Sequence, residues 1–448
     1  MALKALDIFK LLPKTNCKKC GCPTCLAFAM KLAQKQASLD QCPDVTAASK
    51  AQLEGAAAPP IRLVTLGAGD KKVEIGNETV QFRHEESFYH PPAIGVIIPD
   101  NLDDAALKAR LSACAKLHFT RVGARIGIGM VAVENVSCDA ARFAATVSAL
   151  AAASPGIPVV LMSKNAAHAG AAIPACGSAK PLIHAGEEAD MDAFIKLAKD
   201  NNCPLALRGR DIDDLADRVD KAKKAGIQDL ILDVTSGSAS ATVQSLSAVR
   251  RLALKRSAKG LGYPCMTVSR NADAAVGVSE CCVFVSKYAG IVLTPLHQPE
   301  EILPILTVGQ NLYTDPRKPI QVEPKLYTVG NVTNASPLLL TTNFSLTFYT
   351  VEGEVEASRV PAYIGVIDTE GTSVLTAFAS DKMTSEKIAA FLKSDAVTKA
   401  VSHRKVIIPG YVAAMSGSLE EDSGWEVMVG PREASGIPKF LKTVWKSE

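Results

Sequence analysis

The chain is poor in aromatic residues and has no uninterrupted apolar run long enough to cross a membrane. Aromatic residues make up 5% of its 448 positions. Surfaces that bind nucleic acid combine basic side chains with aromatic rings that stack on bases, and the sequence contains no such patch and no arginine-rich arm. The apolar stretch 144–163 is broken by Pro155, Gly156 and Pro158. We therefore expect no nucleic-acid partner and no membrane span.

A strong net charge is missing as well. The 49 basic and 46 acidic residues leave a formal charge of +3, so no global field attracts polyanions or anionic membranes. The N-terminal stretch carries charges at Lys4, Asp7 and Lys10 and lacks the apolar centre of a signal peptide. Twelve cysteines without a secretory signal indicate a reducing compartment, and we expect a cytoplasmic protein.

Four cysteines near the N-terminus have the spacing of an iron–sulfur loop. Cys17, Cys20, Cys25 and Cys42 form a C-x2-C-x4-C-x16-C pattern. A [4Fe–4S] cluster needs four thiolates that converge from different directions, and a tight loop can supply three of them while a later turn supplies the fourth. Gly21 lets such a loop wrap closely around the inorganic core. The spacing predicts a [4Fe–4S] cluster on these four cysteines and a role in electron transfer.

A fifth cysteine and a second metal leave alternatives open. Cys22 lies so close to Cys20 that we leave it out of the ligand set. Structural zinc also uses C-x2-C pairs, but a zinc ribbon needs a second such pair, and none surrounds Cys42. Zinc remains the main alternative to iron–sulfur. Disulfides come third, because nothing else marks the chain as secreted.

The middle of the chain repeats a short apolar run followed by a helical stretch. Continuous apolar strands that alternate with helices indicate a parallel sheet covered on both faces, and eight such units indicate a closed (β/α)8 TIM barrel. Polar residues that end the runs, such as Glu134 and His184, would lie on the C-terminal face, where barrels bind ligands. A solvated rim or a protein interface explains them equally well. The runs are 93–99, 126–136, 158–164, 181–186, 204–209, 230–237, 264–270 and 291–296.

The last segment has a different pattern. Helical stretches separate its apolar runs, so we expect a small doubly wound α/β domain that binds its ligand at the carboxyl ends of the strands. The glycines that follow three of the runs do not form a G-x-G-x-x-G string, so no nicotinamide dinucleotide is indicated. The expected strands are 338–343, 345–350, 363–368, 405–409 and 425–429.

These patterns predict an α/β protein of three domains. A small helical [4Fe–4S] domain would occupy residues 1–58, the central TIM barrel residues 59–323, and the C-terminal α/β domain residues 324–448. The alanine- and proline-rich stretches 56–60 and 316–324 would join them as semi-rigid linkers.

The cysteine loop, the barrel and the glycine-punctuated tail together resemble one known family. It is the large (gamma) subunit of the corrinoid/iron–sulfur protein of the reductive acetyl-CoA pathway. In that family a [4Fe–4S] domain, a barrel and a corrinoid-binding domain follow in this order. The matching strings span all three segments: NCKKCGCPTCLAFAMKLA, LLLTTNFSLTFYTVEGEVE, GTSVLTAFASDKMTSEKI and PGYVAAMSGSLEEDSGWEVMVGPREASGIPKFL.

The resemblance implies a methyl carrier that forms a heterodimer with the family's small subunit. Its cob(I)amide would accept a methyl group from methyltetrahydrofolate through a methyltransferase and deliver it to CO dehydrogenase/acetyl-CoA synthase. The [4Fe–4S] cluster would reduce inactive Co(II) to Co(I), with electrons from a donor such as ferredoxin. The chain would then be a carrier and electron-transfer component of an anaerobic carbon-fixation pathway rather than a stand-alone enzyme, with no catalytic residue of its own.

The corrinoid is expected to be base-off, without a protein histidine on cobalt. Co(I) is four-coordinate, and its filled axial orbital opposes a strong axial donor. The tail lacks the D-x-H-x-x-G string with which many B12 proteins bind cobalt, and its one histidine, His403, precedes the strand that begins at Lys405. Mapped by segment, the resemblance implies corrinoid contacts at Thr341, Thr342, Asn343, Phe344, Leu346, Gly371, Thr372, Ser373, Val374, Gly410, Ala413, Gly417, Gly430 and Ala434.

Two other functions remain open on the sequence. The chain could be a self-contained corrinoid-dependent methyltransferase whose barrel binds a methylpterin through Asp233, Asn271 and Asn135. It could also be an iron–sulfur electron-transfer protein without cobalt. Methyl transfer in the absence of an added methyltransferase would identify the first, and a visible spectrum without corrinoid bands would identify the second.

Overall fold

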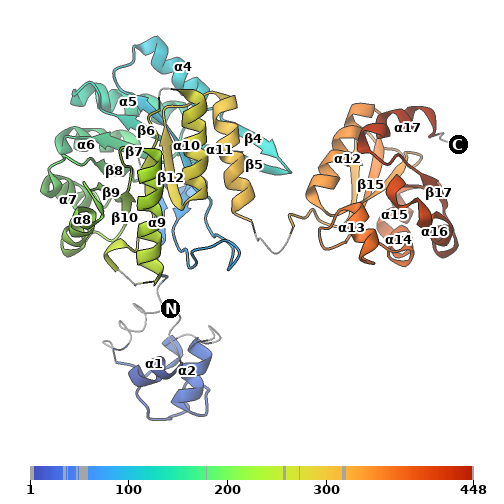
Figure 1. Ribbon diagram of the computed structural model, residues 1–448, viewed down its shortest axis with the longest axis horizontal. Coiled ribbons are helices and arrows are strands. Elements are labelled where there is room, and N and C mark those ends of the chain that lie inside the picture. Colours follow the sequence, from blue (N-terminus) through green and yellow to red (C-terminus); the bar gives the residue numbers. More distant parts are fainter. Residues whose placement is uncertain are drawn as a thin grey trace. The chain divides into compact units, whose positions relative to one another are not determined.

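The computed structural model describes residues 5–33, 37, 39–46, 49, 59–177, 179–255, 259–271, 273–314 and 319–445. The chain divides into two compact units: residues 1–118 with 127–313, and residues 119–126 with 314–448. Residues 56–58 and 316–318 of the two expected linkers lie outside the described part, and the domain boundaries at 58/59 and 323/324 stay predictions. Figure 1 shows the helices and strands of each part.

Two helices pack together in the N-terminal segment. Helix α1 (Ala5–Leu11) ends before Pro13, which cannot continue a helix, and α2 (Cys25–Ala33) follows the cysteine loop. Residues 34–36 and 38 lie outside the described part, and Leu39–Gln41 forms a 3-10 turn (η1). Ile8 and Phe28 form the centre of the small core between the two helices.

Eight parallel strands close into the expected barrel, and each comes from one of the eight apolar runs. Their order around the barrel is β10-β11-β12-β3-β6-β7-β8-β9. Interior side chains such as Met130, Ile231 and Met266 are completely buried, so the barrel is a packed core and not a pore. The strands are β3 (Ala93–Pro99), β6 (Met130–Glu134), β7 (Val159–Ser163), β8 (Leu182–Ala185), β9 (Leu205–Arg208), β10 (Leu230–Asp233), β11 (Cys265–Val268) and β12 (Ala289–Thr294).

Helices follow these strands and surround the barrel (Figure 1). Several begin where the sequence provides an N-cap: the carboxylates of Asp103, Asp139, Asp190, Asp211 and Asp273 accept hydrogen bonds from backbone N–H groups of the first turn. A cap of this kind stabilises a helix by about 1 kcal/mol. The helices are α4 (Asp104–Cys114), α5 (Ala140–Ala153), α6 (Ala166–Ala172), α7 (Met191–Asp200), α8 (Ile212–Lys224), α9 (Ala239–Lys255), α10 (Ala274–Ser286) and α11 (Pro299–Leu312).

Two short antiparallel ribbons form outside the barrel sheet. Strands β1 (Val64–Leu66) and β2 (Val73–Ile75) pair with each other, and their apolar side chains join the barrel core. Strands β4 (His118–Arg121) and β5 (Ala124–Gly127) form a hairpin between α4 and β6. The expected strand 126–136 is therefore too long at its start, because its first two residues belong to the hairpin.

The C-terminal domain is a doubly wound α/β fold, as expected. Its sheet has the order β13-β15-β14-β16-β17, and β13 (Leu326–Val329) is an antiparallel edge strand that the sequence pattern did not indicate. Buried clusters cover both faces of the sheet, one around Leu340 and Ile408 and the other around Leu339 and Ile407. The four parallel strands are β14 (Leu338–Thr342), β15 (Ala362–Ile367), β16 (Lys405–Ile408) and β17 (Glu426–Val429).

The expected strand 345–350 is wrong, because these residues begin helix α12 (Ser345–Ser358). Threonines at alternate positions favour a strand locally. However, β14 and β15 are parallel neighbours, and a chain that joins parallel strands must cross over, usually by a helix. Phe348 and Val355 bury one side of that helix against the sheet, so tertiary packing overrides the local preference.

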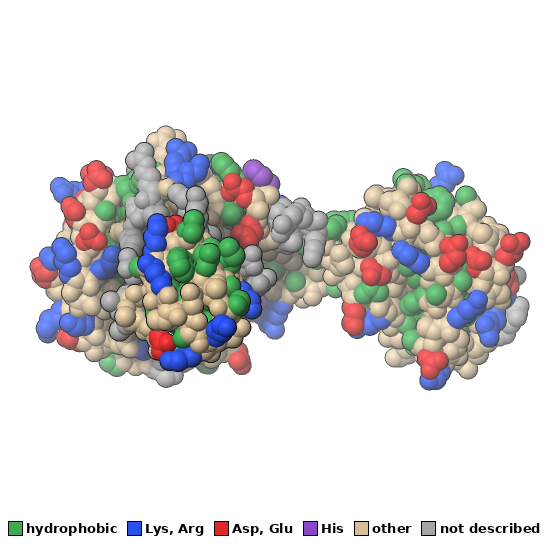
Figure 2. Space-filling model, turned by 90° about the horizontal axis from the view of Figure 1, so that it is seen from below, with side chains coloured by type: hydrophobic (Ala, Val, Ile, Leu, Met, Phe, Trp, Pro, Cys, Tyr) green, Lys and Arg blue, Asp and Glu red, His purple; other side chains and the backbone are tan. Residues whose placement is uncertain are grey.

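Five further helices and two 3-10 segments complete the C-terminal domain. Acidic and basic side chains are mixed over the face of this domain in Figure 2, in keeping with the balanced composition. Among the described helices of the whole chain, none is long and apolar enough to cross a membrane. The remaining elements are α13 (Val374–Ala379), α14 (Ser385–Leu392), α15 (Asp395–Ala400), η5 (Gly410–Met415), α16 (Ser416–Ser423), η6 (Ala434–Gly436) and α17 (Ile437–Thr443).

Candidate functional site

The cysteine loop turns sharply several times between α1 and α2. Asn16, Lys18 and Gly21 all have positive φ angles, of 49°, 62° and 74°. Asn16 fixes the end of the loop, since its Oδ1 accepts a hydrogen bond from the Cys25 backbone N–H at 2.8 Å. Its own backbone N–H lies 3.4 Å from the Cys25 sulfur. Cys25 begins α2, where free backbone N–H groups and the helix dipole stabilise negative charge.

The loop brings the four predicted cluster ligands into one neighbourhood. Burial raises the pKa of the Cys42 thiol, and the nearby charges of Cys20, Cys17 and Cys25 raise it further. Cys25 and Cys42 are buried, whereas Cys17 is exposed. Cys22 packs in the apolar core of this domain at 4% exposure. Cys25 and Cys42 belong to the same core, so burial does not separate Cys22 from them, and the ligand set without Cys22 stays a prediction.

The arrangement gives no support to a single-ion site. A structural zinc ion needs its ligands to converge on one point. Within the part of the chain that the structure describes, no three Cys, His, Asp or Glu side chains are close enough to hold one metal ion. A four-iron cluster makes a different demand, because each of its four thiolates binds a different iron atom. The [4Fe–4S] assignment of the four loop thiols stays a prediction.

A pocket opens at the carboxyl ends of β14, β16 and β17 in the C-terminal domain. After β14 the chain moves to β15 on one side and later returns to β16 on the other, so the strand order reverses between β14 and β16. Open α/β sheets bind ligands at such a switch point. The pocket contains about 810 Å³ of empty space, part of it open to solvent. Five of the expected corrinoid contacts line it: Thr341, Ser373, Val374, Gly430 and Ala434.

Thr341 is the most informative of these residues. Its side chain is completely buried, yet its hydroxyl has no hydrogen-bond partner among the described residues. A buried hydroxyl without a partner costs roughly 1–3 kcal/mol, so a ligand that offers a polar atom would recover part of this cost. The neighbouring Thr342 hydroxyl is also buried and unpaired, but Thr342 points to the opposite face of the sheet and does not line the pocket.

Asn343 has a structural role in the floor of this region. Its Oδ1 accepts hydrogen bonds from the backbone N–H groups of Thr369 and Gly371 and from the Thr369 hydroxyl, at 2.9–3.0 Å. Its Nδ2 donates to Asp368 and Gln321. Both ends of the amide are thus used to hold the loop after β15. Asn343 shapes the site through that loop and has no free group for a ligand.

Gly410 allows two loops at the pocket rim to touch. A Cβ atom at this position would lie 2.6 Å from the carbonyl oxygen of Gly430 and 2.7 Å from the backbone nitrogen of Arg432. The Gly410 N–H also donates to the Pro431 carbonyl at 3.0 Å. The glycine therefore lies beneath the rim and does not line the pocket itself. Gly371, with φ of +73°, has a similar role against Gln321.

The other expected contacts are not pocket-lining residues. Leu346 is exposed at 53%, and Gly417 is exposed on α16. The sequence pattern missed Leu375, Tyr411 and Arg432, which do line the pocket. Tyr411 and Arg432 each lie three residues beyond the end of a strand, β16 and β17, so a search of the loops that follow the strands would have found them. The remaining residues, which do not line the pocket, are Phe344, Thr372 and Ala413.

No histidine is among the described residues that line the pocket. His403 lies at the amino end of β16, and both of its ring nitrogens are engaged. Nδ1 accepts a hydrogen bond from the Lys405 N–H at 3.2 Å, and Nε2 lies 2.8 Å from the Ser336 carbonyl oxygen. The lining that the structure describes is mostly apolar, which fits the faces of a large ring, and it offers no imidazole.

The polar groups at the carboxyl face of the barrel are occupied by one another. Asp233 accepts from His184 Nε2 at 2.8 Å and from both the N–H and the hydroxyl of Thr235. Burial raises the pKa of Asp233. The hydrogen bonds from His184 and Thr235, together with the charge of His184, outweigh this effect, so the pKa of Asp233 is lowered overall. Asn135 and Asn271 likewise use their amides on protein neighbours.

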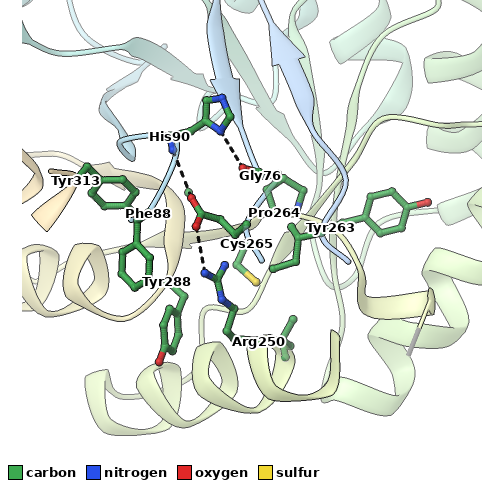
Figure 3. A pocket seen from close by; sticks show the side chains of 13 residues that line it. Gly76, Phe88, His90, Arg250, Tyr263, Pro264, Cys265, Tyr288 and Tyr313 are labelled. Carbon is green, nitrogen blue, oxygen red and sulfur yellow. Dashed lines mark hydrogen bonds and ion pairs between the residues drawn. The ribbon is translucent and has the colours of Figure 1, made fainter. Parts of the chain in front are cut away.

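A second pocket, with about 460 Å³ of empty space that is partly open to solvent, lies at the amino-terminal end of the barrel (Figure 3). Arg250 donates to Glu78 at 3.2 Å and to the Val80 carbonyl at 3.0 Å. Glu78 also accepts from the backbone of Tyr89 and His90. The buried ion pair fastens this segment to the barrel, at the end where barrel residues serve stability. Its groups are satisfied, so the pocket is not a candidate site.

Two family models match the chain. Residues 63–441 match a family described as the CO dehydrogenase/acetyl-CoA synthase delta subunit, and residues 12–43 match one described as a putative Fe-S cluster. The second match contains all four predicted cluster ligands.

Curated relatives match over almost the whole chain. The corrinoid/iron-sulfur protein large subunit of Moorella thermoacetica is 45% identical over 442 residues, covering 99% of both chains. The acetyl-CoA decarbonylase/synthase complex subunit gamma of Methanothermobacter thermautotrophicus is 35% identical, covering 98% of this chain and 99% of its own. The 7,8-dihydropteroate synthase of Vibrio fischeri superposes on 56% of this chain and 100% of its own, with a TM-score of 0.42 and 14% identity. On the curated relatives, the chain belongs to the family of corrinoid/iron–sulfur protein large subunits.

Proposed function

We propose that this chain is a methyl carrier that works as a heterodimer with a small subunit. It would receive a methyl group from methyltetrahydrofolate through a separate methyltransferase and deliver it to CO dehydrogenase/acetyl-CoA synthase. When bound, the corrinoid supplies the cobalt that carries the methyl group, and the cluster supplies single electrons that restore oxidised cobalt. An electron donor such as ferredoxin would serve the cluster.

The pocket of the C-terminal domain carries this proposal. Its lining is mostly apolar and suits the faces of a large ring. The Thr341 hydroxyl has no hydrogen-bond partner among the described residues and can bind a polar atom of a ligand. No histidine is among the lining residues that the structure describes, so a corrinoid held there would receive no protein imidazole from this lining. Four exposed apolar side chains lie near the carboxyl ends of the strands, where a partner protein could cover them: Leu346, Leu375, Tyr411 and Val429.

The cluster loop supports the electron-transfer part of the proposal. Cys25 and Cys42 anchor the loop in the core, whereas Cys17 reaches the surface. An exposed ligand offers an electron donor a short path to the cluster. Lys18 and Lys19 directly follow Cys17, and Lys19 pairs with Asp44 at 3.1 Å, so the surface around Cys17 is charged and hydrated.

Metal analysis and a transfer assay test the proposal together. Protein purified without oxygen, with its small subunit, should contain four irons, four sulfides and one cobalt. Methyl transfer from methyltetrahydrofolate should require an added methyltransferase. Protein that contains iron but no cobalt, and shows no corrinoid bands, would contradict the proposal and identify a simple electron-transfer module.

The structure does not favour the self-contained methyltransferase. A pterin ring needs free hydrogen-bonding groups. The side chains of Asp233, Asn135 and Asn271 already form hydrogen bonds with neighbouring residues of the barrel. Transfer without an added methyltransferase would nevertheless establish that alternative.

A further inference from the structure

One charged side chain lines the apolar pocket of the C-terminal domain. It belongs to Arg432, in the loop after β17, and the other lining residues that the structure describes are uncharged. Arg432 is exposed, and its guanidinium group has no hydrogen-bond or ion-pair partner among the described residues. An arginine without a protein partner at the edge of an apolar pocket is available to an anionic part of a ligand.

The backbone of Arg432 is held at the rim from two sides. The preceding Pro431 carbonyl accepts the Gly410 N–H at 3.0 Å, and the close approach of Gly410 leaves no space for a side chain there. The following residue, Glu433, accepts a hydrogen bond from the Tyr411 hydroxyl at 2.6 Å. The neighbouring carboxylate is therefore used by Tyr411, and the position from which Arg432 extends is well defined.

The chemistry of corrinoids suggests what this arginine would recognise. The periphery of a complete cobamide carries neutral amides, and its one fixed negative charge is the phosphodiester in the loop that links the ring to the lower base. Arginine binds phosphate through two parallel N–H groups and keeps its charge at any physiological pH. We propose that Arg432 pairs with this phosphodiester, so that the protein selects complete cobamides over corrinoids that lack the nucleotide loop.

This inference rests on the proposed function and adds a specificity determinant to it. Because no lining residue offers an imidazole to the metal, apolar burial and peripheral contacts must hold the ring. Apolar contacts are not directional, and a single charge pair at one point of the rim would fix how the ring is turned in the pocket.

Binding of two corrinoids to the full-length protein tests the inference. Cobinamide shares the ring with cobamide but lacks the phosphodiester and the lower base. Affinities for both would be measured from the change in the visible spectrum, using cobalt-free protein together with its small subunit. The variants are Arg432→Gln, Arg432→Lys and, as a matched control, Arg404→Gln. The Arg404 guanidinium lies 5.7 Å from the Trp425 ring centre, and Arg404 does not line the pocket.

The wild-type protein should bind cobamide at least tenfold more tightly than cobinamide. Arg432→Gln should remove most of this preference by weakening cobamide alone, Arg432→Lys should keep part of it, and Arg404→Gln should keep all of it. The preference should also shrink as salt is raised, since Arg432 is exposed.

Equal affinity of the wild-type protein for both corrinoids would overturn the inference, as would an unchanged preference in Arg432→Gln. If Arg432→Gln does not fold, the Arg432→Lys variant and the salt series still decide the question. Failure of the wild-type protein to bind either corrinoid, with its cluster intact, would instead contradict the proposed function.

Discussion

Leu339 of β14 lies directly opposite Ile407 of β16 where these two parallel strands pair. The pocket opens beyond this pair, toward the carboxyl ends of the strands, and both residues contribute to its lining. On the other side of β14, five residue pairs hold β14 and β15 together along their length. Strand β14 is therefore paired along its length with β15 but at a single residue pair with β16. The wider separation from β16 leaves space for a ligand at the point where the strand order reverses.

We expect Cys20→Ala to abolish the iron–sulfur cluster and Cys22→Ala to preserve it. The charges of Cys17, Cys20 and Cys25 act on the Cys42 thiol and raise its pKa, and Cys22 is not among the groups that do so. Iron and sulfide content and the low-potential signal of the reduced cluster are the measurements. The opposite result, with loss in Cys22→Ala and retention in Cys20→Ala, would contradict the ligand set.

Thr341→Val should have opposite effects on the cobalt-free and the cobalt-bound protein. It removes a buried hydroxyl without a partner, so it should stabilise the cobalt-free protein by roughly 1 kcal/mol. It should also weaken corrinoid binding several-fold, because the hydroxyl would pair with the ligand.

Thr342→Val is the matched control for this variant. Its hydroxyl is equally buried and unpaired, but Thr342 does not line the pocket. It should stabilise the protein without changing corrinoid affinity. Denaturant unfolding and spectral titration measure the two effects, and identical behaviour of the two variants would disprove a role for Thr341 in binding.

Gly410→Ala should destabilise the C-terminal domain and reduce its cobalt content. The new Cβ would lie within 2.7 Å of backbone atoms of Gly430 and Arg432, and such overpacking costs roughly 1–3 kcal/mol. Gly417→Ala provides the control, since a Cβ there meets no atom within 4 Å and the position is a helical one in α16. The control should be neutral or stabilising by up to about 1 kcal/mol. An unaffected Gly410→Ala protein would show that the rim can move apart freely.

Asp233→Asn should destabilise the barrel by about 3 kcal/mol at neutral pH, because it breaks a buried pair with His184. The pKa of Asp233 is lowered in the folded protein, so its contribution is complete above the unfolded-state pKa of about 3.9. The contribution is lost as the pH falls below that value and through the folded-state pKa. Urea unfolding at a series of pH values should therefore show a difference between wild type and variant that narrows only in acid. A difference that stays constant into acid would contradict the lowered pKa.

Reduction of the cluster by an acidic electron carrier should slow as salt is raised. Residues 1–58 carry eight lysines and four carboxylates, whereas the rest of the chain has 41 basic and 42 acidic residues. Lys18→Gln, next to the exposed Cys17, should lower the association rate a few-fold, and Lys108→Gln on the barrel helix α4 should not. Stopped-flow rates and the cluster midpoint potential separate docking from a change in potential. A rate that is independent of salt would disprove electrostatic docking.

The barrel was predictable because its strands are buried on both faces. A strand such as β7 (Val159–Ser163) is buried at every position, so it stands out as a continuous apolar run between helices. The cysteine spacing was equally local, since the ligands of one loop must come from nearby residues. Helix α12 was not predictable in this way, because its first residues favour a strand and only the crossover from β14 to β15 makes them helical.

The sequence by itself determined the eight barrel strands and the four parallel strands of the C-terminal sheet, because continuous burial leaves apolar runs in the order of residues. It also predicts which cysteines share a cluster. Only the tertiary structure decided what the polar residues do. It pairs Asp233 with His184, uses Asn343 to hold a loop, and leaves the Thr341 hydroxyl and the Arg432 guanidinium without partners at one pocket. Hydrogen bonds between residues far apart in the chain depend on how the strands are ordered in space, and no local pattern records that order.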